Sequence, residues 1–276
     1  MPNANDEQVE YWNGRAGQSW VAAQAQLDGM LAPISAALLE RSGARRGERA
    51  VDVGCGCGDS ALALAQRGVA VWGIDISEPM LALARSRAAG LDNVAFSRTD
   101  AARADFTPDH DLVLSRFGVM FFADPHAAFQ NLRTALVDNG RLCFVCWQAP
   151  QLNPWVAIAG KAVRPFLPEP EEQADPRAPG PFAFAEAQYV RDILARAGFA
   201  DIAIDGFEPT LHLADDLDGA MEFLQQVGPL SHALAELDES AQAAALDAAR
   251  QALAPYATPQ GLNLDGACWL VSARAG

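Results

Sequence analysis

Short apolar runs alternate with longer amphipathic stretches through the middle of the chain. Runs rich in β-branched or aromatic residues, each bounded by Gly, Asp or Asn, predict five strands. They are RAVDVG (49–54), VAVWGID (69–75), NVAFSRTD (93–100), DLVLS (111–115) and GRLCFVCW (140–147). Residues 59–67, 77–89 and 124–137 predict the helices between them, each opened by a residue that can cap a helix. This alternation predicts right-handed crossovers and a mostly parallel sheet with helices on both faces.

The flanking segments have other patterns. Residues 1–48 predict an N-terminal helical cover, because apolar residues recur there at helical spacing, and Pro33 suits the first turn of a second helix. Residues 149–185 hold eight of the 17 prolines and predict a lid segment. The remaining segments predict a returning core helix and strand, a helical insertion and a terminal core strand, in residues 186–207, 208–260 and 261–276.

Composition narrows the classes of partner. The formal net charge is −15, with 35 acidic and 20 basic residues, so the chain repels phosphate backbones, and nucleic acid and anionic membranes are not expected partners. The longest stretch without a formal charge, residues 142–160, contains Gln148, Pro150 and Asn153 and does not fit a membrane span. The first residues lack the basic and apolar regions of an export signal, which favours a cytoplasmic location.

The cysteine pattern raises the question of a metal. The pairs Cys55/Cys57 and Cys143/Cys146 have spacings that could bring thiolates together. The first pair, however, alternates with glycines in a tight loop, and the second lies in an apolar strand, where cysteine behaves as a small hydrophobe. We therefore expect no metal site.

The strongest chemical signal is the glycine loop, VDVGCGCGDSALALA (51–65). Its glycines allow a sharp turn and close approach of the backbone to a ligand, while the helix that follows presents unpaired N–H groups. Asp75 lies 21 residues after Gly54, at the end of the next strand, where a carboxylate can accept hydrogen bonds from ribose hydroxyls.

The spacing of the loop separates two ligand classes. A dinucleotide fingerprint has its third glycine five residues after the first, but Gly58 comes four residues after Gly54, and Asp59 follows it. A carboxylate beside a pyrophosphate is unfavourable. The loop therefore favours a nucleoside ligand without phosphate, and a nicotinamide oxidoreductase is the weaker alternative.

Because of the glycine loop and Asp75, the stretch 49–147 resembles the class I S-adenosylmethionine-dependent methyltransferases. The glycine loop resembles their first motif, Asp75 their second acidic position, Asp100 the position after the third strand, and residues 266–275 their final strand. The segment SRFGVMFFADPHAAFQNLRTALVDNGRLCFVCW, followed by NPW, is similar to bacterial small-molecule methyltransferases of the type 11 group. Where that group carries Pro-Gly-Gly before the fifth strand, this chain has Asp138, Asn139 and Gly140, and Asn can adopt the same left-handed turn.

The resemblance implies an α/β fold: a Rossmann-like seven-stranded, mostly parallel sheet with an antiparallel last strand, helices on both faces, the N-terminal cover and the helical and Pro-rich lid insertions. It implies S-adenosylmethionine as cofactor and S-adenosylhomocysteine as product. Asp75 would hold the ribose, Ile76 would pack on adenine, and Asp100 with the Ala101 backbone would read the adenine edge. The expected cofactor-binding set is Asp52, Gly54, Gly56, Gly58, Asp75, Ile76, Met80, Asp100, Ala101, Ser115 and Trp20.

The N-terminal aromatic residues have two interpretations. Tyr11, Trp12 and Trp20 resemble the opening pattern of the same group and would close over the cofactor. Alternatively, they fix the cover helix to the sheet by hydrophobic packing.

Methyl transfer from a sulfonium is an in-line displacement, in which positioning supplies much of the acceleration. A general base is needed only when the acceptor loses a proton early, and His126, at a helix start near the end of the fourth strand, is the candidate. The candidate substrate-binding residues are Arg116, Phe117, Phe121, Trp147 and Trp155. An aromatic pocket of this kind suits a planar, apolar acceptor or stabilises a cationic product.

These observations predict a methyltransferase that acts on a small organic acceptor, as a monomer or a homodimer. The alternative is a protein of the same fold that binds S-adenosylmethionine or S-adenosylhomocysteine without methyl transfer, because the binding loop would be common to both.

Overall fold

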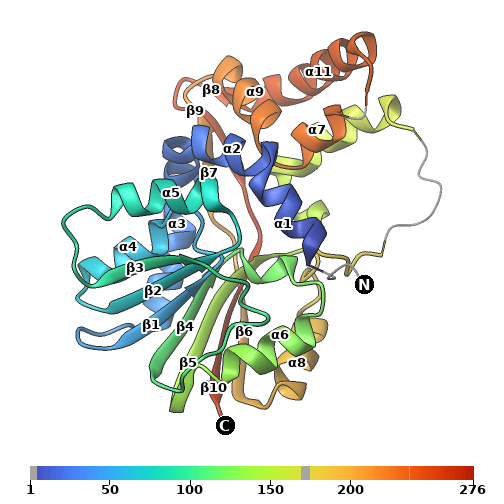
Figure 1. The fold of residues 1–276 in the computed structure, drawn as a ribbon. Coiled ribbons are helices and arrows are strands. Elements are labelled where there is room, and N and C mark those ends of the chain that lie inside the picture. Colours follow the sequence, from blue (N-terminus) through green and yellow to red (C-terminus); the bar gives the residue numbers. More distant parts are fainter. Residues whose placement is uncertain (1–4, 169–174, 236) are drawn as a thin grey trace.

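The computed structural model describes residues 5–168, 175–235 and 237–276. Its core is a seven-stranded sheet of order β3-β2-β1-β4-β5-β10-β6 (Figure 1). The strands are β1 (Arg49–Val53), β2 (Ala70–Asp75), β3 (Val94–Arg98), β4 (His110–Arg116), β5 (Leu136–Trp147), β6 (Phe199–Phe207) and β10 (Cys268–Ala275). Strands β1 to β5 pair in parallel, and β10 is antiparallel to both β5 and β6. The predicted mostly parallel sheet with an antiparallel last strand is confirmed.

The strand order positions the site. From β1 the chain proceeds to β2 and β3 on one side, and then returns to place β4 and β5 on the other side of β1. In an open α/β sheet, ligands bind at the carboxyl ends of the strands where the order reverses. Here that point lies between β1 and β4, where Val51 pairs with Val113 and both side chains are fully buried.

Helices cover the two faces of the sheet. They are α3 (Gln24–Ser42), α4 (Asp59–Gln66), α5 (Glu78–Arg87), α6 (Pro125–Arg133) and α8 (Ala187–Arg196). Helix α3 contacts β4, β5 and β10, while α6 and α8 pack against each other on the opposite face (Figure 1). With both faces covered, the central strands β1 and β4 are buried along most of their length, as is typical of parallel strands.

The N-terminal cover consists of α1 (Asp6–Asn13), α2 (Arg15–Ala22) and α3. Pro33 lies inside α3 rather than in the first turn of a second helix, so that prediction was wrong. The buried stripe of Leu31, Ile34 and Leu38 continues past it, while the proline itself is exposed. Burial of this stripe offsets the hydrogen bond that proline removes from the helix.

The insertions form a cap over the carboxyl edge of the sheet. Its elements are α7 (Pro154–Val163), α9 (Leu217–Gln226), α10 (Pro229–Ala235), α11 (Glu239–Leu253), β7 (Thr210–Ala214), β8 (Ala257–Thr258) and β9 (Gly261–Asp265). Helix α7, from the predicted lid segment, packs along α11 of the predicted insertion (Figure 1). Residues 169–174 of the lid segment lie outside the described residues. Short 3-10 helices occur at Val119–Phe121, Pro150–Leu152, Arg164–Phe166 and Ala254–Tyr256.

Two predicted boundaries differ from the structure. The segment from 208 begins with strand β7 rather than a helix, and β9 pairs with β7 and β8 in a small antiparallel sheet. The predicted terminal strand from 261 is therefore divided, and only β10 joins the core sheet. In the part of the chain that the structure describes, we find no helix with the length and apolar character needed to cross a membrane.

Candidate functional site

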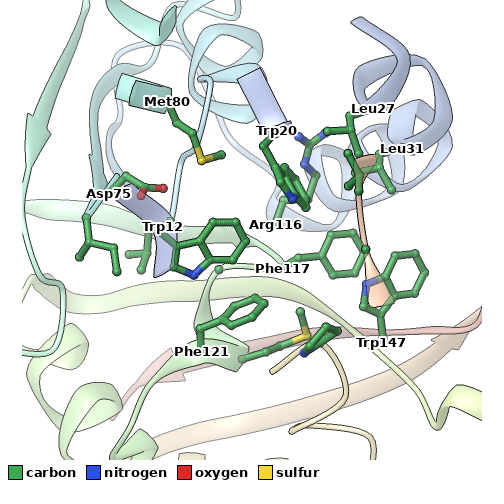
Figure 2. Close-up of a pocket in the computed structure, with 18 of the residues that line it drawn as sticks. Trp12, Trp20, Leu27, Leu31, Asp75, Met80, Arg116, Phe117, Phe121 and Trp147 are labelled. Atoms are coloured by element: carbon green, nitrogen blue, oxygen red, sulfur yellow. The ribbon is translucent and has the colours of Figure 1, made fainter. Parts of the chain in front are cut away.

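A cavity of about 180 Å³ lies where the carboxyl ends of β1, β2, β4 and β5 meet the N-terminal cover and the cap (Figure 2). Most of the residues singled out from the sequence are brought together on its wall. They are Trp20, Gly54, Asp75, Ile76, Met80, Asp100, Ala101, Arg116, Phe117, Phe121, Trp147 and Trp155.

Four further members of the predicted cofactor set lie beside or below this wall. Gly56 lines a smaller adjoining pocket. Ser115 is buried and donates from Oγ to the carbonyl of Val53 at 2.7 Å, and Asp52 is buried and accepts from Ser60 Oγ at 2.6 Å. Gly58 caps α4 from a left-handed conformation, with φ of 89°. Asp52 and Ser115 therefore bond to residues that flank the glycine loop, and Gly58 ends the loop where α4 begins.

The glycine loop is held by a backbone-to-backbone contact. Gly54 adopts a positive φ of 64°, and a Cβ there would lie 2.7 Å from the Cα of Gly118, in the turn after β4. Side chains are thus excluded from the contact between the two loops that form the floor of the site.

Asp75 is fixed by two backbone donors. Its Oδ2 accepts from the Gly56 N–H at 2.8 Å and its Oδ1 from the Ser77 N–H at 2.8 Å. Burial raises the pKa of this carboxyl, while the two hydrogen bonds act in the opposite direction. Each oxygen keeps a second acceptor position, and the side chain lines the cavity, so it can receive a pair of hydroxyl donors.

The neighbouring wall is suited to a flat ring. Ile76 and Met80 supply apolar surface, and Asp100 follows β3 at the edge of the same space. The Asp100 Oδ1 accepts from the Ala102 N–H at 3.0 Å, which fixes the carboxylate. A ligand with vicinal hydroxyls and an aromatic ring with an amino edge matches this set of groups.

Arg116 has a different environment from the one expected for a substrate-binding residue. Its Nη1 donates to Asp59 Oδ2 and to Ser35 Oγ, both at 2.7 Å. Its Nη2 lies 3.8 Å from Asp28, which also pairs with Arg87 at 2.6 Å. The guanidinium therefore borders the cavity while it links α3 of the cover to α4, and its charge is compensated by carboxylates.

Aromatic side chains form two groups on the cavity wall (Figure 2). The stacked wall consists of Phe117, Trp147 and Trp155, with ring centroids 4.3 Å apart in the first pair and 5.0 Å in the second. The roof consists of Trp12, Trp20 and Phe121, with Trp12 edge-on to Trp20 at 5.8 Å and to Phe121 at 5.2 Å.

Sequence reasoning missed the contribution of the cap to this cavity. Phe223 of α9, Val227 directly after this helix and Pro229 complete the apolar side. Their helical spacing was visible, but the direction in which α9 faces depends on its packing against β7. Among the described residues that line the cavity, the formally charged ones are Asp75, Asp100 and Arg116, which come from the strand ends β2, β3 and β4.

The structure does not bring His126 to the cavity. Helix α6 begins at Pro125, and the His126 ring lies edge-on to Tyr189 of α8, with centroids 6.5 Å apart. His126 is not among the described residues that line the cavity, so its role as a catalytic base stays a prediction.

The cysteines of the glycine loop, Cys55 and Cys57, are buried. Burial raises the pKa of Cys57 to about 12 and that of Cys55 above its ordinary value, so both thiols are protonated at neutral pH. Within residues 5–168, 175–235 and 237–276, no group of three or more His, Cys, Asp or Glu side chains is arranged to hold a metal ion.

Comparison with known proteins shows what this chain is similar to. Residues 50–140, about a third of the chain, match the family model described as a methyltransferase domain. The matched stretch contains the glycine loop, strands β1 (from Ala50) to β4 and the start of β5. A demethylmenaquinone methyltransferase of Clavibacter sepedonicus is 36% identical over 105 residues, which cover 38% of this chain and 43% of the relative. The chain spans about half the length of the curated relatives it matches.

Solved structures share the fold at low identity. Phosphoethanolamine N-methyltransferase 2 of Haemonchus contortus, in complex with phosphomonomethylethanolamine and S-adenosylhomocysteine, is 20% identical with a TM-score of 0.55, over 88% of this chain and 52% of that one. The [4+2]-cyclase SpnF is 20% identical with a TM-score of 0.53, over 88% of this chain and 79% of that one.

Proposed function

We propose that the protein binds S-adenosylmethionine and transfers its methyl group to a small, planar, apolar acceptor. The observation that carries this proposal is the division of one cavity into two parts. The charged lining residues Asp75, Asp100 and Arg116 lie at the ends of β2, β3 and β4. Toward Trp147 and the cap, the lining side chains are aromatic and aliphatic, among them Trp155, Phe223 and Val227.

The charged part fits the cofactor. Asp75 would accept the two ribose hydroxyls, Ile76 and Met80 would pack on the adenine faces, and Asp100 would accept from the adenine amino group. The bound cofactor supplies an electrophilic methyl group on a positively charged sulfur. The acidic side chains around the glycine loop favour a cation, because Arg116 is already paired with Asp59.

The apolar part determines the acceptor class. An ionised carboxylate or phosphate placed between Trp147, Trp155 and Phe223 would lose its hydration without a compensating partner, which costs several kcal/mol or more. A flat apolar ring would instead lie against the stacked wall. The Clavibacter relative is named for demethylmenaquinone, which makes that compound a first acceptor to test.

Positioning is the catalytic contribution that these side chains support. Among the described lining residues there is no histidine, cysteine, tyrosine or lysine that could remove a proton. The stacked wall would orient the acceptor ring, and the roof would exclude water, so that the nucleophilic atom approaches the methyl carbon in line with the departing sulfur. This mechanism requires an acceptor atom that is reactive without a base from the protein.

Two measurements test the proposal. Titration calorimetry should give binding of S-adenosylhomocysteine and no comparable heat with NADH. Incubation with methyl-labelled S-adenosylmethionine should transfer label to the chemically reduced, hydroquinone form of demethylmenaquinone, whose electron-rich ring carbon attacks the methyl group and then loses its proton to water, or to an apolar component of a cell extract. Binding of S-adenosylhomocysteine without transfer to any of these would instead support the non-methylating alternative, and preference for NADH would contradict the cofactor assignment.

A further inference from the structure

Helices α1 and α5 exchange hydrogen bonds at their ends, although they are more than 60 residues apart in the chain. Ser77 precedes α5 in the N-cap position, but its hydroxyl makes no bond to an N–H of that helix. It donates instead to the carbonyl of Trp12, near the end of α1, at 2.7 Å. One unpaired carbonyl of α1 is thereby satisfied by the residue that would normally cap α5.

Asn13 supplies the missing cap in return. Its Oδ1 accepts from the N–H of Glu78, the first residue of α5, at 3.0 Å. Its Nδ2 donates to the carbonyl of Ile76 at 2.9 Å and to Val9 in its own helix at 2.7 Å. Three hydrogen bonds therefore join the end of α1 to residues 76–78, and we call this set the α1–α5 latch.

The latch lies directly beside the cofactor-facing groups. Residues 76–78 continue from Asp75, whose Oδ1 accepts from the Ser77 N–H at 2.8 Å. On the other side of the latch, the Trp12 side chain forms part of the cavity roof, between Asp75 and Phe121 (Figure 2). Movement of α1 away from α5 would thus displace the roof and release Ile76 at the same time.

The backbone of α2 packs tightly against the hydrogen bond between Ser77 and Trp12. A Cβ at Gly17, in α2, would lie 2.1 Å from the Trp12 carbonyl oxygen and 2.9 Å from Ser77 Oγ. Helix α2 therefore packs against both partners of one latch hydrogen bond, and it also contacts α5 (Figure 1). Only glycine at position 17 allows the three segments to meet.

We propose that Asn13 and Ser77 are positioning residues that hold the N-terminal cover closed over the cofactor site, so that release of the cofactor requires the α1–α5 latch to open. The inference rests on the proposed function, because it assumes that this end of the cavity holds the cofactor. Neither side chain needs to touch the ligand: Asn13 and Ser77 act through Ile76, Asp75 and Trp12.

The test uses the full chain and S-adenosylhomocysteine as the probe. Asn13→Ala removes two of the three latch bonds, and Ser77→Ala removes the third while leaving the Ser77 N–H on Asp75. Glu10→Ala is the matched control, because Glu10 is an exposed residue of the same helix. Affinity is measured by calorimetry, and the dissociation rate by stopped-flow tryptophan fluorescence.

We expect each latch variant to bind S-adenosylhomocysteine about 10-fold more weakly, mainly through faster dissociation. Loss of one or two hydrogen bonds removes a net free energy that corresponds to about this change in affinity. The Asn13→Ala/Ser77→Ala double variant should lose little more than either single variant, since either change opens the same contact. Asn13→Asp keeps the acceptor for Glu78 and should recover part of the affinity. Glu10→Ala should bind as the unaltered protein does.

The possible outcomes distinguish failure of the latch proposal from failure of the proposed function. If the unaltered protein binds S-adenosylhomocysteine and the folded variants match its affinity and dissociation rate within two-fold, the latch is refuted. If the unaltered protein does not bind, the cofactor assignment itself fails. Should Asn13→Ala fail to fold, Ser77→Ala decides the question alone, because its hydroxyl supports no N–H of α5.

Discussion

Phe117 stacks face to face on Trp147, with ring centroids 4.3 Å apart and ring planes within 11° of parallel. Phe117 directly follows β4 and has a positive φ of 64°, which is uncommon for a residue with a side chain. Such a conformation costs on the order of 1–3 kcal/mol and persists only where surrounding contacts enforce it. In this backbone conformation the Phe117 ring lies on Trp147 at the cavity wall. The cost of the positive φ can be measured by comparing the stabilities of glycine and alanine variants at this position.

Phe117→Gly should be more stable than Phe117→Ala, by about 1 kcal/mol. Both substitutions remove the stacked ring, but glycine adopts the positive φ without steric cost and alanine does not. Urea denaturation of the two variants measures the difference in the free energy of unfolding. An alanine variant as stable as the glycine variant would show that the backbone relaxes when the ring is absent.

Asp75→Ala should weaken binding of S-adenosylhomocysteine at least 10-fold. The substitution removes the proposed acceptor of the ribose hydroxyls and leaves the Gly56 and Ser77 N–H groups without their partner. Asp75→Asn keeps one acceptor oxygen and should lose less. Calorimetry compares the three proteins, and equal affinities would remove Asp75 from the ribose site.

Arg116 and Asp59 should show a coupling energy of about 1–2 kcal/mol in a double-mutant cycle of Arg116→Met and Asp59→Asn. Their pair is mostly shielded from water, with 12% and 25% of the two side chains exposed, so screening is limited. The exposed pair of Arg177 and Glu186 is the control, because 50% and 63% of those side chains are accessible. We expect that pair to couple by roughly 0.5 kcal/mol or less. Equal coupling in both cycles would contradict a special role for the Arg116 network.

Asp52→Asn should become more stable relative to the unaltered protein as the pH rises. Burial raises the pKa of Asp52 to about 7, against the opposing hydrogen bond from Ser60, so the folded state binds the proton more tightly than the unfolded chain. The contribution of this group is fully present below about pH 4 and is lost as the pH rises through about 7. The difference in free energy of unfolding should change by about 2–4 kcal/mol over this range. A difference that does not vary with pH would place the pKa near its ordinary value.

The sheet and the glycine loop were predictable because their signals are local. Strands β4 and β5 contain short apolar runs, Leu112–Leu114 and Leu142–Trp147, and the left-handed positions of the loop carry glycines. Asn139, which stands where similar proteins carry glycine, does adopt a positive φ of 61°. Asp75 follows from its distance in the chain to the loop and its place at the end of a strand.

Other features depend on contacts between distant segments. The alternation in Thr210–Ala214 and Gly261–Asp265 is a strand signal, but these segments are short and lie about 50 residues apart, so their pairing in β7 and β9 was missed. The position of Arg116 after the fourth strand suggested a place at the site, but its pairing with Ser35 and Asp59 depends on helix packing that the sequence does not give. The same limit applies to Asn13, whose cap on α5 requires knowledge of the folded chain.

The antiparallel placement of β10 has a consequence for synthesis of the protein. Strand β10 lies between β5 and β6, yet the ribosome makes it after the whole cap. Until Cys268–Ala275 emerges, β5 has an open edge with apolar side chains from Leu142 to Trp147, which is the kind of edge that pairs with other nascent chains. The cavity therefore acquires its finished Trp147 wall only after translation of β10, and premature termination in the cap would release an aggregation-prone intermediate rather than a smaller functional domain.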